Sequence, residues 1–105
     1  MNFNDYLATF DSVEHLSGID IVNQDNEVVH HIPAIAGKLG SLKLYYALAK
    51  QFDKRLNAEA AEQGLIWFAE HVQDALAHVG KHPNIDLLLQ AKEQQVNWTI
   101  EAIEA

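Results

Sequence analysis

The longest helical pattern in the chain runs over residues 57–79, and it constrains the fold more than any other stretch. Along it, apolar residues recur at intervals of three and four, which is the spacing of one face of an amphipathic helix. These residues are Ala58, Ala61, Leu65, Ala69, Val72, Leu76 and Val79. The sequence therefore predicts one long helix, around which the remaining elements pack.

A second line of residues on this predicted helix follows the same spacing. It consists of Ala60, Gly64, Trp67, His71, Asp74 and His78. Small residues allow a second backbone to approach closely, and tryptophan is enriched at interfaces. We therefore predict that this line packs against a second surface, either the sheet of the same chain or another copy in a homodimer, the commonest oligomer. The alternative is a solvent-exposed face that carries one isolated tryptophan.

The rest of the chain predicts a single α+β domain that spans residues 1–105, with a small antiparallel sheet packed on helices. In chain order, the predicted elements are a helix over residues 3–10, strands over 19–22 and 28–32, helices over 42–56 and 57–79, a helix that starts at Asn84, and a strand over 96–103. The two early strands form a β-hairpin. Because an isolated hairpin is rarely stable, we expect the C-terminal strand to join it.

The first predicted helix carries three aromatic side chains, Phe3, Tyr6 and Phe10, along one face. Asn2 or Asn4 is expected to cap its N-terminus. These aromatic side chains are most simply explained as part of the core, with an aromatic ligand-binding box as the alternative.

Composition limits the partners that such a domain binds. Seven Lys and Arg residues against fifteen Asp and Glu residues give a formal net charge of −8, which disfavours nucleic acid and acidic membrane surfaces. The chain has no cysteine, so disulfides and thiolate metal sites are excluded. It has no apolar run long enough to span a membrane and no N-terminal export signal, so we expect a cytoplasmic protein.

Two loops, over residues 37–41 and 80–84, each place a Gly–Lys step before a predicted helix start. Helix N-termini present free backbone N–H groups and a partial positive charge, so they bind anions readily. The small-anion site that these loops predict consists of Lys38, Ser41, Lys81, His82 and Asn84. The nucleotide P-loop pattern is not matched. The alternative is that Ser41 and Asn84 are ordinary helix caps.

A third possibility is a divalent-metal enzyme that uses His71, Asp74, His78 or His82. Ligands seven residues apart on a helix are separated by roughly 10 Å, because the helix rises about 1.5 Å per residue. The compact His-Glu-x-x-His arrangement is absent. We therefore assign no metal ligand, no cofactor and no catalytic residue.

The two loops also carry a resemblance to a known family. Their runs are Gly-Lys-Leu-Gly-Ser-Leu at residues 37–42 and Gly-Lys-His-Pro-Asn-Ile-Asp at residues 80–86. Together with the segments 28–33 and 64–71, these runs resemble a family of small bacterial proteins classed as a domain of unknown function. The resemblance implies a bacterial cytosolic domain without an assigned activity, and it supplies no catalytic residue.

The second line on the predicted long helix decides the leading functional prediction. Because a single core offers this line no obvious use, we predict a non-enzymatic domain that works through protein contacts and self-associates. Two alternatives stay open: a domain that binds a small anionic ligand, and a divalent-metal-dependent enzyme.

Overall fold

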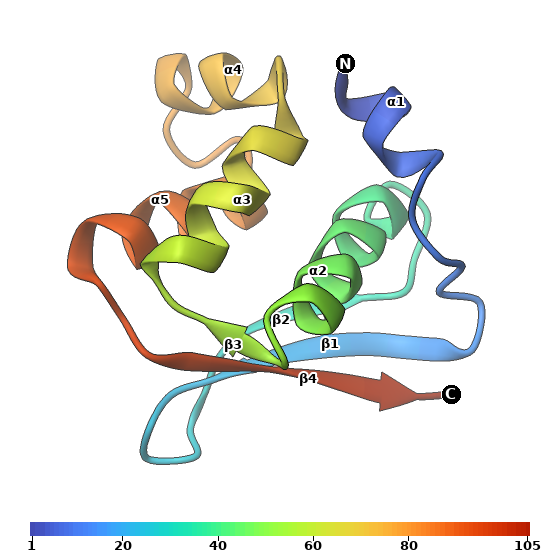
Figure 1. Cartoon of the computed structure of the whole chain (residues 1–105), viewed down its shortest axis with the longest axis vertical. Coiled ribbons are helices and arrows are strands. Elements are labelled where there is room, and N and C mark those ends of the chain that lie inside the picture. Colours follow the sequence, from blue (N-terminus) through green and yellow to red (C-terminus); the bar gives the residue numbers. More distant parts are fainter.

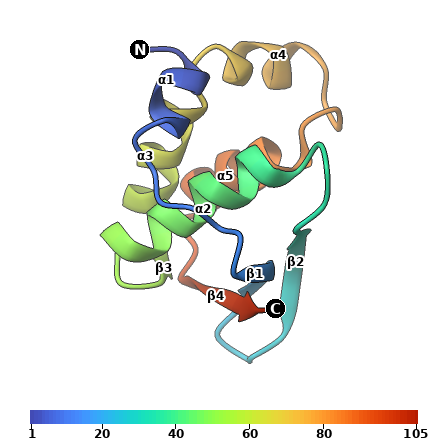
Figure 2. The same cartoon turned by 90° about the vertical axis from the view of Figure 1, so that its right-hand side faces the viewer.

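Four β-strands form one antiparallel sheet, and the helices lie on one side of it (Figures 1 and 2). The structure is a computed structural model that describes residues 1–105. In chain order its elements are α1 (Phe3–Leu7), β1 (Leu16–Val22), β2 (Val28–Pro33), α2 (Leu39–Gln51), β3 (Arg55–Leu56), α3 (Ala58–Phe68), α4 (His71–Ala77), α5 (Pro83–Gln94) and β4 (Trp98–Glu104). The predicted α+β class is confirmed, with its N-terminal helix, hairpin and C-terminal strand. None of the helices has the length and hydrophobicity needed to cross a bilayer.

The sheet is organised around β1, which pairs with β2 on one side and β4 on the other, in the strand order β2-β1-β4-β3. In the middle of the sheet, Ile21 lies opposite His30 of β2 and Ile100 of β4. The C-terminal strand therefore joins the hairpin as predicted. The two-residue strand β3, in which Leu56 pairs with Trp98, is an element that the sequence pattern does not predict.

One face of the sheet carries the apolar core, because side chains alternate between the two faces of a strand. Ile19, Ile21 and Ile100 belong to the core cluster and are fully buried. On β2 the alternation sends His31 to the other face, where its Nδ1 lies 2.6 Å from Asp20 Oδ1. The helix-covered face is therefore the one that can contribute to a site between sheet and helices.

The prediction of one helix over residues 57–79 is wrong, because the segment forms two helices. α3 ends at Phe68 and α4 begins at His71. Between them, Ala69 adopts a positive φ of 51° with ψ at −121°. Alanine has the highest helix propensity of all residues, so local preference does not explain the break.

Contacts with α1 explain the break instead. The ring of Phe3 stacks on Phe68 at 5.5 Å between centroids and meets the ring of His71 edge-on at 4.9 Å. The backbone N–H of Phe3 donates to Glu70 Oε1 at 2.8 Å. A strained non-glycine backbone costs about 1–3 kcal/mol. We infer that this docking offsets the strain at Ala69.

After the break, the apolar side chains of α4 are only partly covered. Ala75 is buried, whereas Leu76 is 61% exposed, and Val79, just after the helix, is 91% exposed. The apolar line predicted for a single long helix therefore does not continue as one buried stripe.

Two further helix starts differ from the predictions. α2 begins with Lys38 at its N-cap position and α5 with His82, and neither residue makes a side-chain capping hydrogen bond. Ser41 and Asn84 therefore lie inside the first turns and do not cap them. Asn2 does cap α1, as expected.

The small residues of the second line pack inside the chain. Ala60 is fully buried. A Cβ atom added to Gly64 would lie 2.7 Å from Leu88 Cδ1 of α5 and 3.0 Å from Leu48 Cδ1 of α2. Helices α2 and α5 thus approach α3 closely at this point. This packing accounts for the two small residues without a second copy of the chain.

We expect Gly64→Val to lower the free energy of unfolding by about 1–3 kcal/mol, because it overpacks a filled core. Chemical denaturation measures the change. Glu62→Val is the matched control, since it introduces the same side chain at an exposed position of α3; surface substitutions usually change stability by about 0.5 kcal/mol or less. Equal stabilities of the two variants would contradict the internal packing of Gly64.

Candidate functional site

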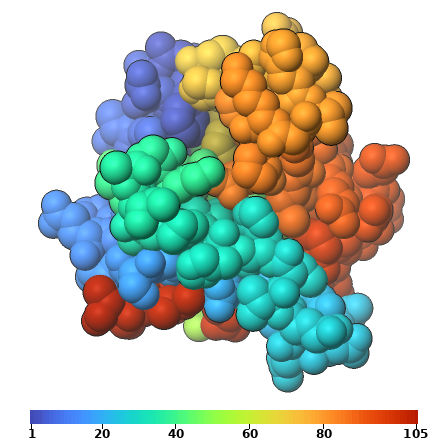
Figure 3. Space-filling view, turned by 180° about the vertical axis from the view of Figure 1, so that it is seen from behind, coloured from blue at the N-terminus to red at the C-terminus, as the bar shows by residue number.

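The two Gly–Lys loops meet at one cavity, although they lie far apart in the sequence. Figure 3 shows the teal segment before and at the start of α2 beside the orange segment that leads into α5. The cavity has a volume of about 160 Å³. Its lining consists of Gly37, Lys38, Ser41, Phe68, Lys81, His82, Pro83, Asn84 and Ile85. The structure thus brings together all five residues of the predicted anion site.

Two glycines shape these loops. Gly37 has φ +86° and Gly80 has φ +89°, in the left-handed region that other residues rarely adopt. Each glycine precedes the lysine of its loop, so the turn is made just before the helix start.

Asn84 is the buried polar residue of the cavity, with only 8% of its surface exposed. His30 Nε2 donates to Asn84 Oδ1 at 2.7 Å, and the hydroxyl of Tyr45 donates to the backbone carbonyl of Asn84 at 2.6 Å. Every fully buried side-chain nitrogen or oxygen in the chain has a hydrogen-bond partner. The Nδ2 group of Asn84 has no acceptor within the chain, so it reaches solvent and is a free donor at the cavity.

The basic residues of the cavity differ in their partners. Lys38 forms no salt bridge, whereas Lys81 and His82 both pair with Asp74 of α4. Asp74 Oδ2 lies 3.0 Å from Lys81 Nζ and 2.5 Å from His82 Nε2, and Asp74 Oδ1 lies 3.7 Å from His78 Nε2. The hydrogen bonds from His82 and Lys81 lower the pKa of Asp74 from 3.8 to about 2.

The chemistry of this arrangement favours a small anion. Two ammonium groups, a hydroxyl and an amide N–H are donors of the kind that oxyanions accept, and the first turn of α2 adds backbone N–H groups. The first turn of α5 adds less, because Pro83 has no N–H and the N–H of Ile85 donates to the carbonyl of His82. Pockets for drug-sized ligands usually measure about 300–1,000 Å³. The smaller cavity therefore suits a group the size of phosphate or carboxylate.

The other predicted residues lie outside this cavity. Trp67 lines a different cleft, and the ring of His71 lies against Phe3. His78 is exposed and reaches only Asp74. No three His, Cys, Asp or Glu side chains come together as a metal site would require.

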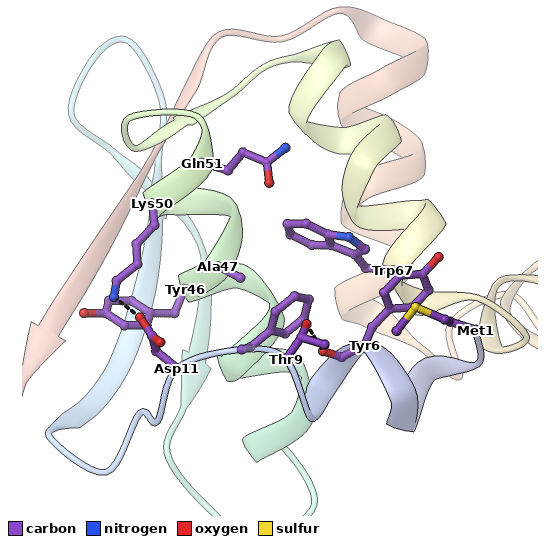
Figure 4. A pocket seen from close by; sticks show the side chains of 10 residues that line it. Met1, Tyr6, Thr9, Asp11, Tyr46, Ala47, Lys50, Gln51 and Trp67 are labelled. Atoms are coloured by element: carbon purple, nitrogen blue, oxygen red, sulfur yellow. Dashed lines mark hydrogen bonds and ion pairs between the residues drawn. The ribbon is translucent and has the colours of Figure 1, made fainter.

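A second and larger cleft was not anticipated from the sequence. It has a volume of about 640 Å³ and lies between α2 on one side and α1 and α3 on the other (Figure 4). Tyr6 and Phe10, which the sequence pattern assigns to the core, line it together with Trp67. The aromatic box that was the alternative for the first helix is the only sequence signal that points to this cleft.

Replacing Asp74 by Asn tests the ion pairs around Lys81 and His82. Because the pKa of Asp74 is lowered in the fold, its stabilising effect is complete above its ordinary pKa of 3.8 and is lost as pH falls through about 2. We therefore expect Asp74→Asn to melt at a lower temperature than the wild type near neutral pH. The two melting temperatures should converge toward pH 2.

The control for this measurement is Asp25→Asn, which makes the same change of charge at an exposed turn residue without an ion pair. It should show no such convergence. A difference between wild type and Asp74→Asn that persists unchanged in acid would contradict the assignment.

Comparison with known proteins gives a family and no individual relative. Neither the curated proteins nor the solved structures include a significant match to this chain. One family model, however, matches residues 3–102 and so covers both Gly–Lys loops and every lining residue of the aromatic cleft except Met1. The chain therefore belongs to the bacterial family described as an uncharacterised protein conserved in bacteria (DUF2322), which confirms the resemblance seen in its sequence.

Proposed function

We propose that this domain binds a small anionic group, of the phosphate or carboxylate class, in the cavity between the two Gly–Lys loops. The observation that carries the proposal is the convergence of Lys38, Ser41, Lys81, His82 and Asn84 on one small cavity. In a chain with a formal charge of −8, a site with two lysines is a local exception. The Nδ2 group of Asn84, which has no acceptor within the chain, adds a neutral donor for an anion.

Each lining group has a distinct role in this proposal. Lys38 supplies the charge that no carboxylate neutralises in the free protein. Ser41 and Asn84 donate neutral hydrogen bonds that fix the orientation of the anion. Lys81 and His82 already pair with Asp74, so this carboxylate acts as an internal competitor. We therefore expect modest affinity.

Thermal unfolding with inorganic phosphate tests the proposal. A ligand at about a hundred times its Kd stabilises the native state by about 2.7 kcal/mol. We expect phosphate to raise the melting temperature of the wild type, and Lys38→Ala to lose most of that rise. Lys92→Ala, at the exposed end of α5, is the matched control and should retain it.

Comparing these two lysine variants also controls for nonspecific stabilisation by phosphate. Phosphate and sulfate stabilise many proteins by exclusion from their surface, and that general effect is the same in both variants. Equal rises in Lys38→Ala and Lys92→Ala would therefore reject the site.

Asp74→Asn gives an independent prediction of opposite sign. It removes the competitor for Lys81 and His82, so phosphate should bind this variant more tightly than it binds the wild type. Isothermal titration calorimetry measures both affinities. Asp25→Asn changes the net charge equally and should bind like the wild type, whereas unchanged affinity in Asp74→Asn would remove Asp74 from the mechanism.

Self-association stays a prediction from the sequence, and we place it second. Two of its proposed interface residues, Ala60 and Gly64, have a use inside the chain. Trp67 keeps part of its surface open, but it faces the aromatic cleft and not a flat face of α3.

A further inference from the structure

The cleft between α2 and the pair α1 and α3 has the size of a small-molecule site. Its volume is about 640 Å³, and pockets for small ligands usually measure about 300–1,000 Å³. Figure 4 shows Tyr46, Ala47, Lys50 and Gln51 along the wall formed by α2, with Trp67 on the facing wall.

The aromatic lining is held in place by the chain itself. The rings of Trp67 and Phe10 pack at 4.7 Å between centroids with an angle of 59°, so Phe10 supports the indole from one side. Trp67 is only partly buried. Ala47, with its short side chain, lies on the opposite wall of the cleft from Trp67 (Figure 4). Such a ring, supported on one side and open on another, is suited to stacking with a second ring.

The cleft carries no unpaired charge among its side chains. Asp11 and Lys50 are the acidic and basic residues of its lining, and they form a hydrogen-bonded ion pair with each other. The pair lowers the pKa of Asp11 and raises that of Lys50, so both groups stay ionised. Lys50 also lies over the ring of Tyr46, at 4.9 Å from its centroid. A charged ligand would therefore find no free counter-charge among these side chains.

We propose that this cleft binds the uncharged aromatic ring of a small molecule, stacked on Trp67 and facing Ala47, with the amide of Gln51 available at the rim. The aromatic lining selects a flat apolar group, and the side chains of the cleft offer a charged group no unpaired counter-charge. The cleft shares no lining residue with the loop cavity. It is therefore a separate site from the proposed anion site.

The direct test is a titration of the ¹⁵N-labelled full chain with indole, followed by amide chemical shifts. We expect saturable shifts at Ala47, Gln51 and the indole N–H of Trp67, with dissociation constants in the millimolar range. Indole-3-acetate, which adds a carboxylate to the same ring, should bind more weakly. The absence of saturable shifts at these residues, shifts confined to another surface, or tighter binding of the acetate would each overturn the proposal.

A substitution that fills the cleft is the second test of the proposal. Ala47→Leu should weaken indole binding about tenfold or more, because its side chain occupies the space in front of Trp67. Ala77→Leu makes the same change at an exposed position of α4 and should bind like the wild type. Equal binding by the two variants would also overturn the proposal. If Ala47→Leu does not fold, the shift map of the wild type decides alone.

Discussion

The hydrogen bonds around Asn84 join the three parts of the molecule on which the loop cavity depends. His30 reaches Asn84 from the edge strand β2, Tyr45 reaches it from α2, and Asn84 itself lies in the first turn of α5. Tyr45 is fully buried, and burial raises the pKa of its hydroxyl well above 10, so this group remains a donor. An unsatisfied polar group at this depth costs about 1–3 kcal/mol. The start of α5 is therefore fixed relative to both the sheet and α2.

This arrangement also explains how an acidic chain gathers cations at one place. The hydrogen bond from Tyr45 of α2 to Asn84 of α5 joins the starts of the two helices, so Lys38 lies near Lys81 and His82, and Asp74 on α4 limits the repulsion between them. In the aromatic cleft the charges are balanced within the lining itself, because Asp11 and Lys50 neutralise each other. The two sites thus offer different chemistry. One keeps an unpaired lysine and a free amide donor, and the other keeps open aromatic surface.

The sequence allowed the fold class to be predicted because the strands have clear local signals. The polar turn between the strands of the hairpin and the alternation after Val96 are properties of neighbouring residues. The break at Ala69 has no such signal, since it arises from the docking of Phe3 on Phe68 and His71. Long-range contact of this kind overrides local propensity.

The two sites were also predictable to different degrees, because some of their features are local in the sequence and others arise only from long-range packing. The Gly–Lys steps identified the residues of the loop cavity, but only the packing of the helices shows that the two loops face each other. The cleft was missed because Tyr6 and Phe10 have the spacing of core residues, and because Trp67 was assigned to an interface. Spacing alone does not distinguish a ring that is covered from one that lines an opening.

The attachment of α4 has a consequence for how the protein opens. This helix has one buried residue, Ala75, and lies between two positive-φ positions, Ala69 and Gly80. Segments with so little buried surface separate from a fold at a lower free energy than its core does. Because Asp74 is carried on α4, each local opening of this helix also separates this carboxylate from Lys81 and His82. The pairing of these two side chains is thus tied to the local stability of a seven-residue helix and not to the global stability of the domain.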